Sequence, residues 1–306
     1  MPVPSRIFGW HRQPQDDGRD HKFHLVFPGR VALPQHAQAH SGPVTDQGQE
    51  GSCVWHGIPS AMVSVFVALG IPLAFINGRY YASQEGYYQY RMVYGDVNSD
   101  DGCEIRVAMK CAAKYGICQE KLWPYKAMAN FATRPSAEAF ANAQNHKIAT
   151  YIALTGNADT LLTSMMTCIA DGYPFVFGVN CTKAWNSDRG VIPQYVPGEG
   201  FDGGHCVICN EYDQPSKTFF GQNSWGTDWG LQPKGRDTRG YFSITFADMS
   251  NPTVTSDFWT IRMTSDYVPP APPVPPAPTP TPIPPPAPVI PDVKVGVRNN
   301  VIQVIK

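Results

Sequence analysis

The chain has 306 residues, which is enough for one large domain or two modest ones. Its 24 basic and 25 acidic residues nearly balance, so charge gives no argument for a nucleic-acid partner or for an anionic membrane surface. The hydrophobic content of 42% is that of a globular protein with a buried core. Fourteen of the 30 prolines fall between Pro269 and Pro291, so the proline excess is local.

The first 24 residues are polar and lack the apolar segment of a secretory signal. We expect them to form an extended leader (residues 1–24). A short strand at residues 24–27 then either edges a sheet or belongs to a segment that crosses a cleft. The apolar run at residues 58–76 has the length of a membrane span, but Pro59 and Gly70 interrupt it and favour a buried helix ending near Gly70. We therefore expect a soluble protein without a membrane partner, located in the cytoplasm or in a larger particle.

Helical patterns dominate the first half of the chain. Ile105, Ala108 and Met109 have the spacing of one helix face, and Gly116 is a typical helix stop. The predicted helices span residues 52–70, 84–94, 105–115, 136–144 and 160–171.

Patterns typical of strands follow in the second half. Short runs rich in β-branched and aromatic residues are separated by Gly, Pro, Asn and Asp. The predicted strands span residues 175–179, 206–209, 218–221, 241–244 and 258–261. Helices first and strands afterwards predict an α+β protein with two lobes, and the cleft between two lobes is a common place for a site.

A separate tail follows the last predicted strand. Residues 268–291 form a proline-rich linker that favours extended polyproline II backbone. Residues 292–306 alternate in hydrophobicity around Asn299-Asn300, a pair that suits a hairpin turn, but they are too few for a stable domain. We expect this hairpin to bind a protein partner or a second copy of the chain by strand addition, or to fold back onto the chain's own sheet.

The eight cysteines are an even number, but the chain is not a small exported domain of the kind that relies on disulfides. His205, Cys206 and Cys209 have a spacing found in redox and zinc sites. No second ligand pair with metal spacing accompanies them, and residues 206–209 have the pattern of an apolar strand. Buried strand cysteines are therefore the better interpretation, and we expect no metal or organic cofactor.

One cysteine stands apart by its position. Cys53 follows a glycine-punctuated loop, residues 47–52, and lies at the start of the predicted helix of residues 52–70. Unpaired N–H groups and the dipole at a helix N-terminus favour an anion, so we expect the pKa of the Cys53 thiol to fall. Far downstream, His205 and Asn223 can supply a base and a residue that orients the base.

These motifs resemble those of the papain family of cysteine proteases, and of its bacterial branch in particular. The chain carries Gln47-Gly-x-x-Gly-Ser-Cys53, then Gly-His205, then Asn223-Ser-Trp-Gly-x-x-Trp-Gly, in the order that the family has. Similar intervening segments extend the resemblance from about residue 44 to residue 261. The resemblance implies a peptidase domain, placed at residues 25–267, with the papain-like fold: a helical lobe that carries the nucleophile helix, an antiparallel β lobe, and the active-site cleft between them.

The resemblance also implies a role for each motif residue. Cys53 would be the nucleophile, His205 the base that takes its proton, and Asn223 the residue that orients the imidazole ring. Gln47 would donate its side-chain amide to the developing oxyanion, with the backbone N–H of Cys53 as second donor. The implied substrate-binding residues are Gly102, Cys103, Gly204 and Trp225.

Several positions depart from the family pattern. Cys103 replaces the second glycine of a Gly-Gly wall that pairs main chain to main chain with the substrate, a change that bears on specificity more than on activity. Gly204 stands where plant members have an acidic residue. Glu50 stands where secreted members have a disulfide cysteine, which agrees with a reducing compartment.

Family members are commonly made with an N-terminal inhibitory segment. About 40 residues precede Gly42, so a short covering segment fits this chain better than a folded helical prodomain.

We expect a cysteine-type endopeptidase that hydrolyses protein or peptide substrates through an acyl-thioester on Cys53. Two alternatives stay open: a non-catalytic assembly protein that works through its proline-rich tail, and an amidase or acyl transferase with the same triad. The intact catalytic set argues against the first alternative, and product analysis would separate the second.

Overall fold

The structure is a computed structural model that describes residues 8–12, 18, 20–23, 32–71, 81–125, 131–187, 189–265, 294–298 and 301–305. The chain divides into two units, Met1–Val268 and Pro269–Lys306. The predicted strand at residues 24–27 and the proline-rich linker lie outside the described residues.

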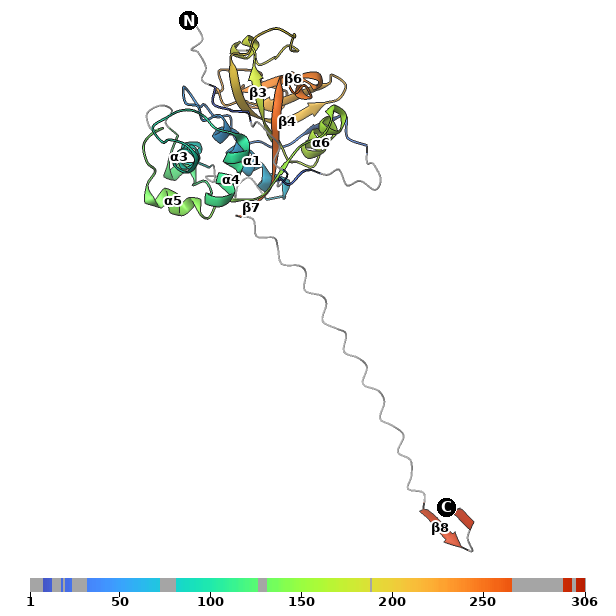
Figure 1. The fold of residues 1–306 in the computed structure, drawn as a ribbon. Coiled ribbons are helices and arrows are strands. Elements are labelled where there is room, and N and C mark those ends of the chain that lie inside the picture. Colours follow the sequence, from blue (N-terminus) through green and yellow to red (C-terminus); the bar gives the residue numbers. More distant parts are fainter. Residues whose placement is uncertain are drawn as a thin grey trace. The chain divides into compact units, whose positions relative to one another are not determined.

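The first unit combines helices with one antiparallel sheet (Figure 1). Gly70 and Gly116 follow the first and third of the described long helices with φ angles of 73° and 82°, a left-handed conformation that glycine adopts without strain and that ends a helix. Ser136 and Asn157 cap two others by accepting hydrogen bonds from backbone N–H groups. The helices are α1 Val54–Ala68, α3 Ser83–Tyr94, α4 Ile105–Tyr115, α5 Ala137–Ala143, α6 Ala158–Ala170 and α7 Phe246–Met249.

Seven strands of the described residues form the sheet in the order β2-β7-β3-β4-β5-β6, with β1 paired to β4. All of these pairs are antiparallel. The bounds are β1 His36–Gln38, β2 Ile148–Ala153, β3 Phe175–Cys181, β4 Gly203–Asp213, β5 Thr218–Gln222, β6 Tyr241–Thr245 and β7 Thr255–Thr264. The five strands predicted in the second half of the chain are present, whereas β1, β2 and α7 were not predicted.

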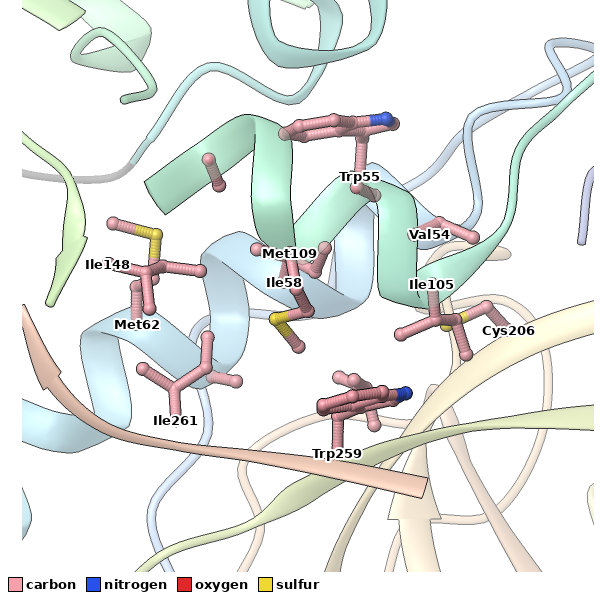
Figure 2. Close-up of a cluster of buried hydrophobic side chains, with 14 of the residues drawn as sticks. Val54, Trp55, Ile58, Met62, Ile105, Met109, Ile148, Cys206, Trp259 and Ile261 are labelled. Atoms are coloured by element: carbon pink, nitrogen blue, oxygen red, sulfur yellow. The ribbon is translucent and has the colours of Figure 1, made fainter. Parts of the chain in front are cut away.

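Helix α1 packs against β4 and β7, which brings its N-terminus to the sheet. Gly57 permits this close approach, because a Cβ there would lie 3.1 Å from Val176 Cγ1 and 3.4 Å from Cys206 Sγ. Figure 2 shows apolar residues of α1 gathered with Trp259 and Ile261 of β7. Each fully buried aliphatic side chain of such a cluster contributes about 1.5–3 kcal/mol.

A second core lies on the other face of the sheet. Along β3, Val176 packs in the core of α1, whereas Phe175 and Phe177 pack in the second core, as strand alternation requires. The two larger cores of the described residues therefore meet at the sheet, as expected for the two predicted lobes.

In the second unit, β8 (Lys294–Arg298) pairs antiparallel with β9 (Val301–Ile305). Arg298 lies opposite Val301, the register that a two-residue turn at Asn299-Asn300 requires.

Among the described residues, no helix combines the length and the apolar character that crossing a bilayer requires.

Candidate active site

Cys53 lies directly before the first residue of α1 and has helical backbone angles, with φ −53° and ψ −39°. Its side chain is fully buried. The backbone N–H groups of Gly9, Val54 and Cys206 lie near its sulfur. The sulfur therefore lies where the leader, α1 and β4 meet.

His205 precedes Cys206 in β4 and lies in the same buried region. Its Nε2 is 2.8 Å from Asn223 Oδ1, and this oxygen also accepts the backbone N–H of Ser224 at 2.8 Å. A carbonyl oxygen can only accept, so Nε2 carries the proton. In the neutral ring Nδ1 then holds the lone pair, which suits that atom to take a proton from a thiol.

The ring of Trp225 covers this histidine. The His205 and Trp225 ring centroids are 4.7 Å apart with an interplanar angle of 21°, a stacked arrangement. Both residues are buried, as is Asn223. Exclusion of water strengthens the hydrogen bond between His205 and Asn223.

Gln47 is fixed at several points. Its Oε1 accepts the Ser224 hydroxyl at 2.6 Å, its Nε2 donates to the backbone oxygen of Glu50 at 2.9 Å, and its backbone N–H donates to Ser224 O at 2.8 Å. Glu50, in the place of the family's disulfide cysteine, is buried and accepts a hydrogen bond from Gln84. The loop before Cys53 is thus tied to the segment that carries Asn223.

Residues 8–12 of the leader, here named the covering segment, lie along the implied substrate wall. Cys103 N donates to Gly9 O at 2.7 Å, and His11 N donates to Cys103 O at 3.1 Å. Trp10 N donates to Gly204 O at 3.0 Å. Gly102 has a φ of 77°, and a Cβ there would lie 2.1 Å from Gly9 O. The wall residues named from the sequence therefore hold a polypeptide, and this polypeptide is the chain's own.

The covering segment also reaches the histidine. The ring of Phe8 meets the rings of His205 and Trp225 edge-on, each at a centroid distance of 6.3 Å. Trp10 is buried. The sequence left a short covering segment open as an interpretation, but Phe8 and Trp10 were not identified from it. They could have been identified from the motif Phe8-Gly9-Trp10, in which two aromatic residues flank a glycine in a mostly polar leader.

The model of the family described as papain family cysteine protease matches residues 33–251. This chain belongs to that family. Xylellain, a cysteine protease from Xylella fastidiosa, has a similar structure, with 30% sequence identity and a TM-score of 0.71 over 83% of this chain and 95% of xylellain. An uncharacterized peptidase C1-like protein of Acanthamoeba polyphaga mimivirus is 29% identical over 229 residues, 72% of this chain and 70% of its own length.

The digestive procathepsin L 3 of Tenebrio molitor has the same fold at 18% identity, with a TM-score of 0.54 over 79% of this chain and 74% of its own. The expected papain-like α+β fold is thus confirmed. The chain is a papain-family cysteine peptidase, a hydrolase that acts on protein or peptide substrates.

In this papain-family protease, burial raises the pKa of the Cys53 thiol to about 11, although nearby backbone hydrogen bonds oppose that rise. The predicted fall in this pKa is therefore wrong for the covered site. The helix N-terminus was identified correctly, but the covering segment and β4 remove water from the sulfur, and desolvation penalises the thiolate.

We predict that Cys53 of the full chain reacts slowly with iodoacetamide at neutral pH. With a pKa of about 11, about one thiol in 10⁴ is ionised at pH 7, and the alkylation rate should rise about tenfold per pH unit toward pH 11. Mass-spectrometric mapping of the alkylated cysteine from pH 6 to 10 measures this dependence. A rate that levels off below pH 8 would show that the thiolate already dominates in the covered site.

A second histidine near Cys53 is not equivalent to His205. His56 of α1 is buried, and its Nδ1 lies 2.8 Å from the Thr45 hydroxyl oxygen. Burial, and secondarily the charge of His205, lowers the pKa of His56 to about 3. Because it stays neutral and faces Thr45, His56 is a poor candidate for the base.

Cys206 and Cys209 are buried in β4, where the apolar strand pattern placed them.

Proposed function

We propose that this chain is an endopeptidase that forms an acyl-thioester on Cys53, with His205 as acid and base, Asn223 as the orienting residue and Gln47 as an oxyanion donor. The observation that carries the proposal is the 2.8 Å contact from His205 Nε2 to Asn223 Oδ1, which leaves the Nδ1 lone pair as the proton acceptor.

In the acylation step the Cys53 proton moves to His205 Nδ1, and the thiolate forms a bond to the carbonyl carbon of the scissile peptide. The carbonyl oxygen becomes an oxyanion, which the Gln47 side-chain amide and the Cys53 backbone N–H stabilise. As the carbon–nitrogen bond breaks, the imidazolium gives its proton to the leaving amine. A water molecule activated by His205 then hydrolyses the thioester and restores the thiol.

An endopeptidase needs a cleft that holds polypeptide on both sides of the scissile bond. The covering segment supports this requirement, since Phe8 contacts His205 and Trp225, Gly9 reaches the Cys53 sulfur, and Trp10 pairs with Gly204. An extended chain therefore fits past the thiol in both directions. A substrate must displace the covering segment, because the two would use the same backbone partners on the wall.

We predict that Asn223→Ala lowers kcat by about 10²-fold or more with a small change in KM, because Asn223 acts through the orientation of His205. Gln47→Ala should have a similar effect, since an oxyanion donor acts mainly on the transition state. Steady-state kinetics on a fluorogenic peptide measures both effects. A pure KM effect from Gln47→Ala would assign this residue to substrate binding instead.

Product analysis separates the endopeptidase from an amidase or acyl transferase. Incubation of the full chain with a protein substrate should give internal cleavage products with free amino and carboxyl ends, which mass spectrometry identifies. Products that retain an acyl group on an added amine would support the transferase.

A further inference from the structure

Trp10 has the most deeply buried side chain of the covering segment, with 4% of its surface exposed. Two glycines make room for its ring. A Cβ at Gly178 would lie 2.0 Å from Trp10 Cε2, and a Cβ at Gly204 would lie 2.9 Å from Cε3. Gly178 interrupts the run of larger residues in β3, and a glycine inside a strand often marks such a close approach. Both glycines lie on one face of the sheet, where they leave room for the flat indole ring.

One carboxylate gives this pocket a polar end. Asp257 Oδ2 accepts the indole N–H of Trp10 at 3.3 Å, and Oδ1 accepts the indole N–H of Trp259 at 2.6 Å. The backbone N–H of Ile105, the first residue of α4, also lies near the carboxylate. Asp257 has a φ of 61°, a left-handed conformation that costs a non-glycine residue about 1–2 kcal/mol. The fold thus holds a partly buried acceptor at one position of the pocket despite backbone strain.

We propose that this pocket, formed by Gly178, Gly204 and Asp257, is a substrate subsite that selects a tryptophan side chain. The inference rests on the proposed function, because it takes the covering segment as an occupant of the substrate cleft. A substrate residue that replaces Trp10 beside Gly204 presents its side chain to the same pocket.

The chemistry of the pocket discriminates among side chains. Phenylalanine fits against the glycines but leaves Asp257 Oδ2 without the indole donor, and the loss of a donor to a partly buried acceptor is costly. Burial raises the pKa of Asp257, and its carboxyl accepts from two neutral indole N–H groups. Tryptophan combines a flat ring with a neutral N–H at its edge.

A binding experiment tests the pocket without catalysis. The full chain with Trp10→Ala is titrated calorimetrically with acetyl-Phe-Gly-X-His-Arg-amide, in which X is Trp, 3-benzothienylalanine, Phe or Ala. Benzothienylalanine has the shape of tryptophan with sulfur in place of the N–H. Trp should bind about tenfold or more tightly than benzothienylalanine, and Ala most weakly. Equal affinities for Trp and benzothienylalanine would overturn the role of Asp257, and equal affinities for all four peptides would overturn the subsite.

Two further substitutions in the Trp10→Ala chain test whether Asp257 and Gly178 cause the preference for tryptophan. In Asp257→Asn, the amide oxygen can still accept from Trp259, asparagine tolerates the positive φ, and the NH₂ group then faces the indole N–H. The Trp to benzothienylalanine affinity ratio should therefore fall to about one or below. Gly178→Val should lower the Trp to Ala ratio at least about tenfold by filling the pocket. Gly200→Val is the matched control, because a Cβ at Gly200 meets no atom within 4 Å. An unchanged ratio in both Asp257→Asn and Gly178→Val would contradict the assignment.

Hydrolysis extends the test to substrates. Fluorogenic tripeptides carry Trp, benzothienylalanine, Phe or Ala at each position in turn. We expect the Trp10→Ala chain to show the same order in kcat/KM at one position. Hydrolysis without any preference at any position would overturn the subsite. Discriminating binding without hydrolysis of any peptide would instead overturn the proposed function and leave the pocket's selectivity intact.

Discussion

Replacement of Cys53 by alanine is expected to lower kcat on a peptide substrate by on the order of 10⁶-fold, the scale seen when a catalytic nucleophile is removed. The sulfur is the atom that bonds to the substrate, and neither water nor His205 replaces it in the same geometry. The fold should survive, because the change deletes one buried atom and costs on the order of 1 kcal/mol, or a few degrees in Tm. Steady-state kinetics and thermal unfolding of the same preparation measure the two effects.

Cys209→Ala is the matched control for this experiment. Cys209 is also buried, but it lies in the second core and takes no part in the proposed site. It should keep most of its activity. A Cys53→Ala chain that retained more than a few per cent of the kcat of Cys209→Ala would contradict the assignment of the nucleophile.

Trp10→Ala is expected to raise kcat/KM of the full chain by about 10²-fold. Removal of a buried tryptophan costs about 3–5 kcal/mol, and this cost falls on the covered state, because the indole contacts hold the covering segment in the cleft. A shift of about 3 kcal/mol raises the open population about 10²-fold until the open state dominates. Kinetics at low concentrations of a fluorogenic peptide measures the increase.

His11→Ala separates the anchor from the rest of the covering segment. The His11 side chain is exposed, and its backbone N–H, which donates to Cys103 O, remains in the alanine variant. The activity of this variant should stay within about threefold of the wild type, since surface substitutions usually change stability by less than about 0.5 kcal/mol. A Trp10→Ala chain no more active than His11→Ala would show that Trp10 does not hold the cleft closed.

Local patterns were sufficient for much of the fold. The apolar spacing and the following glycine predicted α4 with the bounds Ile105–Tyr115 that the structure has. Local patterns did not predict β1, which has three residues. They also did not predict β2, whose exposed and partly exposed residues give little hydrophobic contrast. Both strands owe their conformation to pairing with distant strands, β4 and β7, which a local pattern cannot reveal.

The candidate site was likewise predictable from the sequence only in part. Gln47, Cys53, His205 and Asn223 stand in short motifs that the sequence displays directly, and their catalytic roles stay predictions. The hydrogen bond between Trp10 and Asp257 joins residues 247 positions apart, and no local pattern links them. The raised pKa of Cys53 has the same origin, because burial by a distant segment outweighs the local effect of the helix N-terminus.

Trapping of the acyl-enzyme shows whether Cys53 is the residue that bonds to the substrate. The full chain with Trp10→Ala is mixed with a peptide p-nitrophenyl ester, quenched in acid within the first turnovers, and analysed by intact mass and peptide mapping. We predict one acyl group per chain, located on Cys53 and missing from the chain that also carries Cys53→Ala. An acyl group on another residue would contradict the assignment of Cys53 as the nucleophile. Equal acylation of the chain that carries Cys53→Ala would contradict it as well.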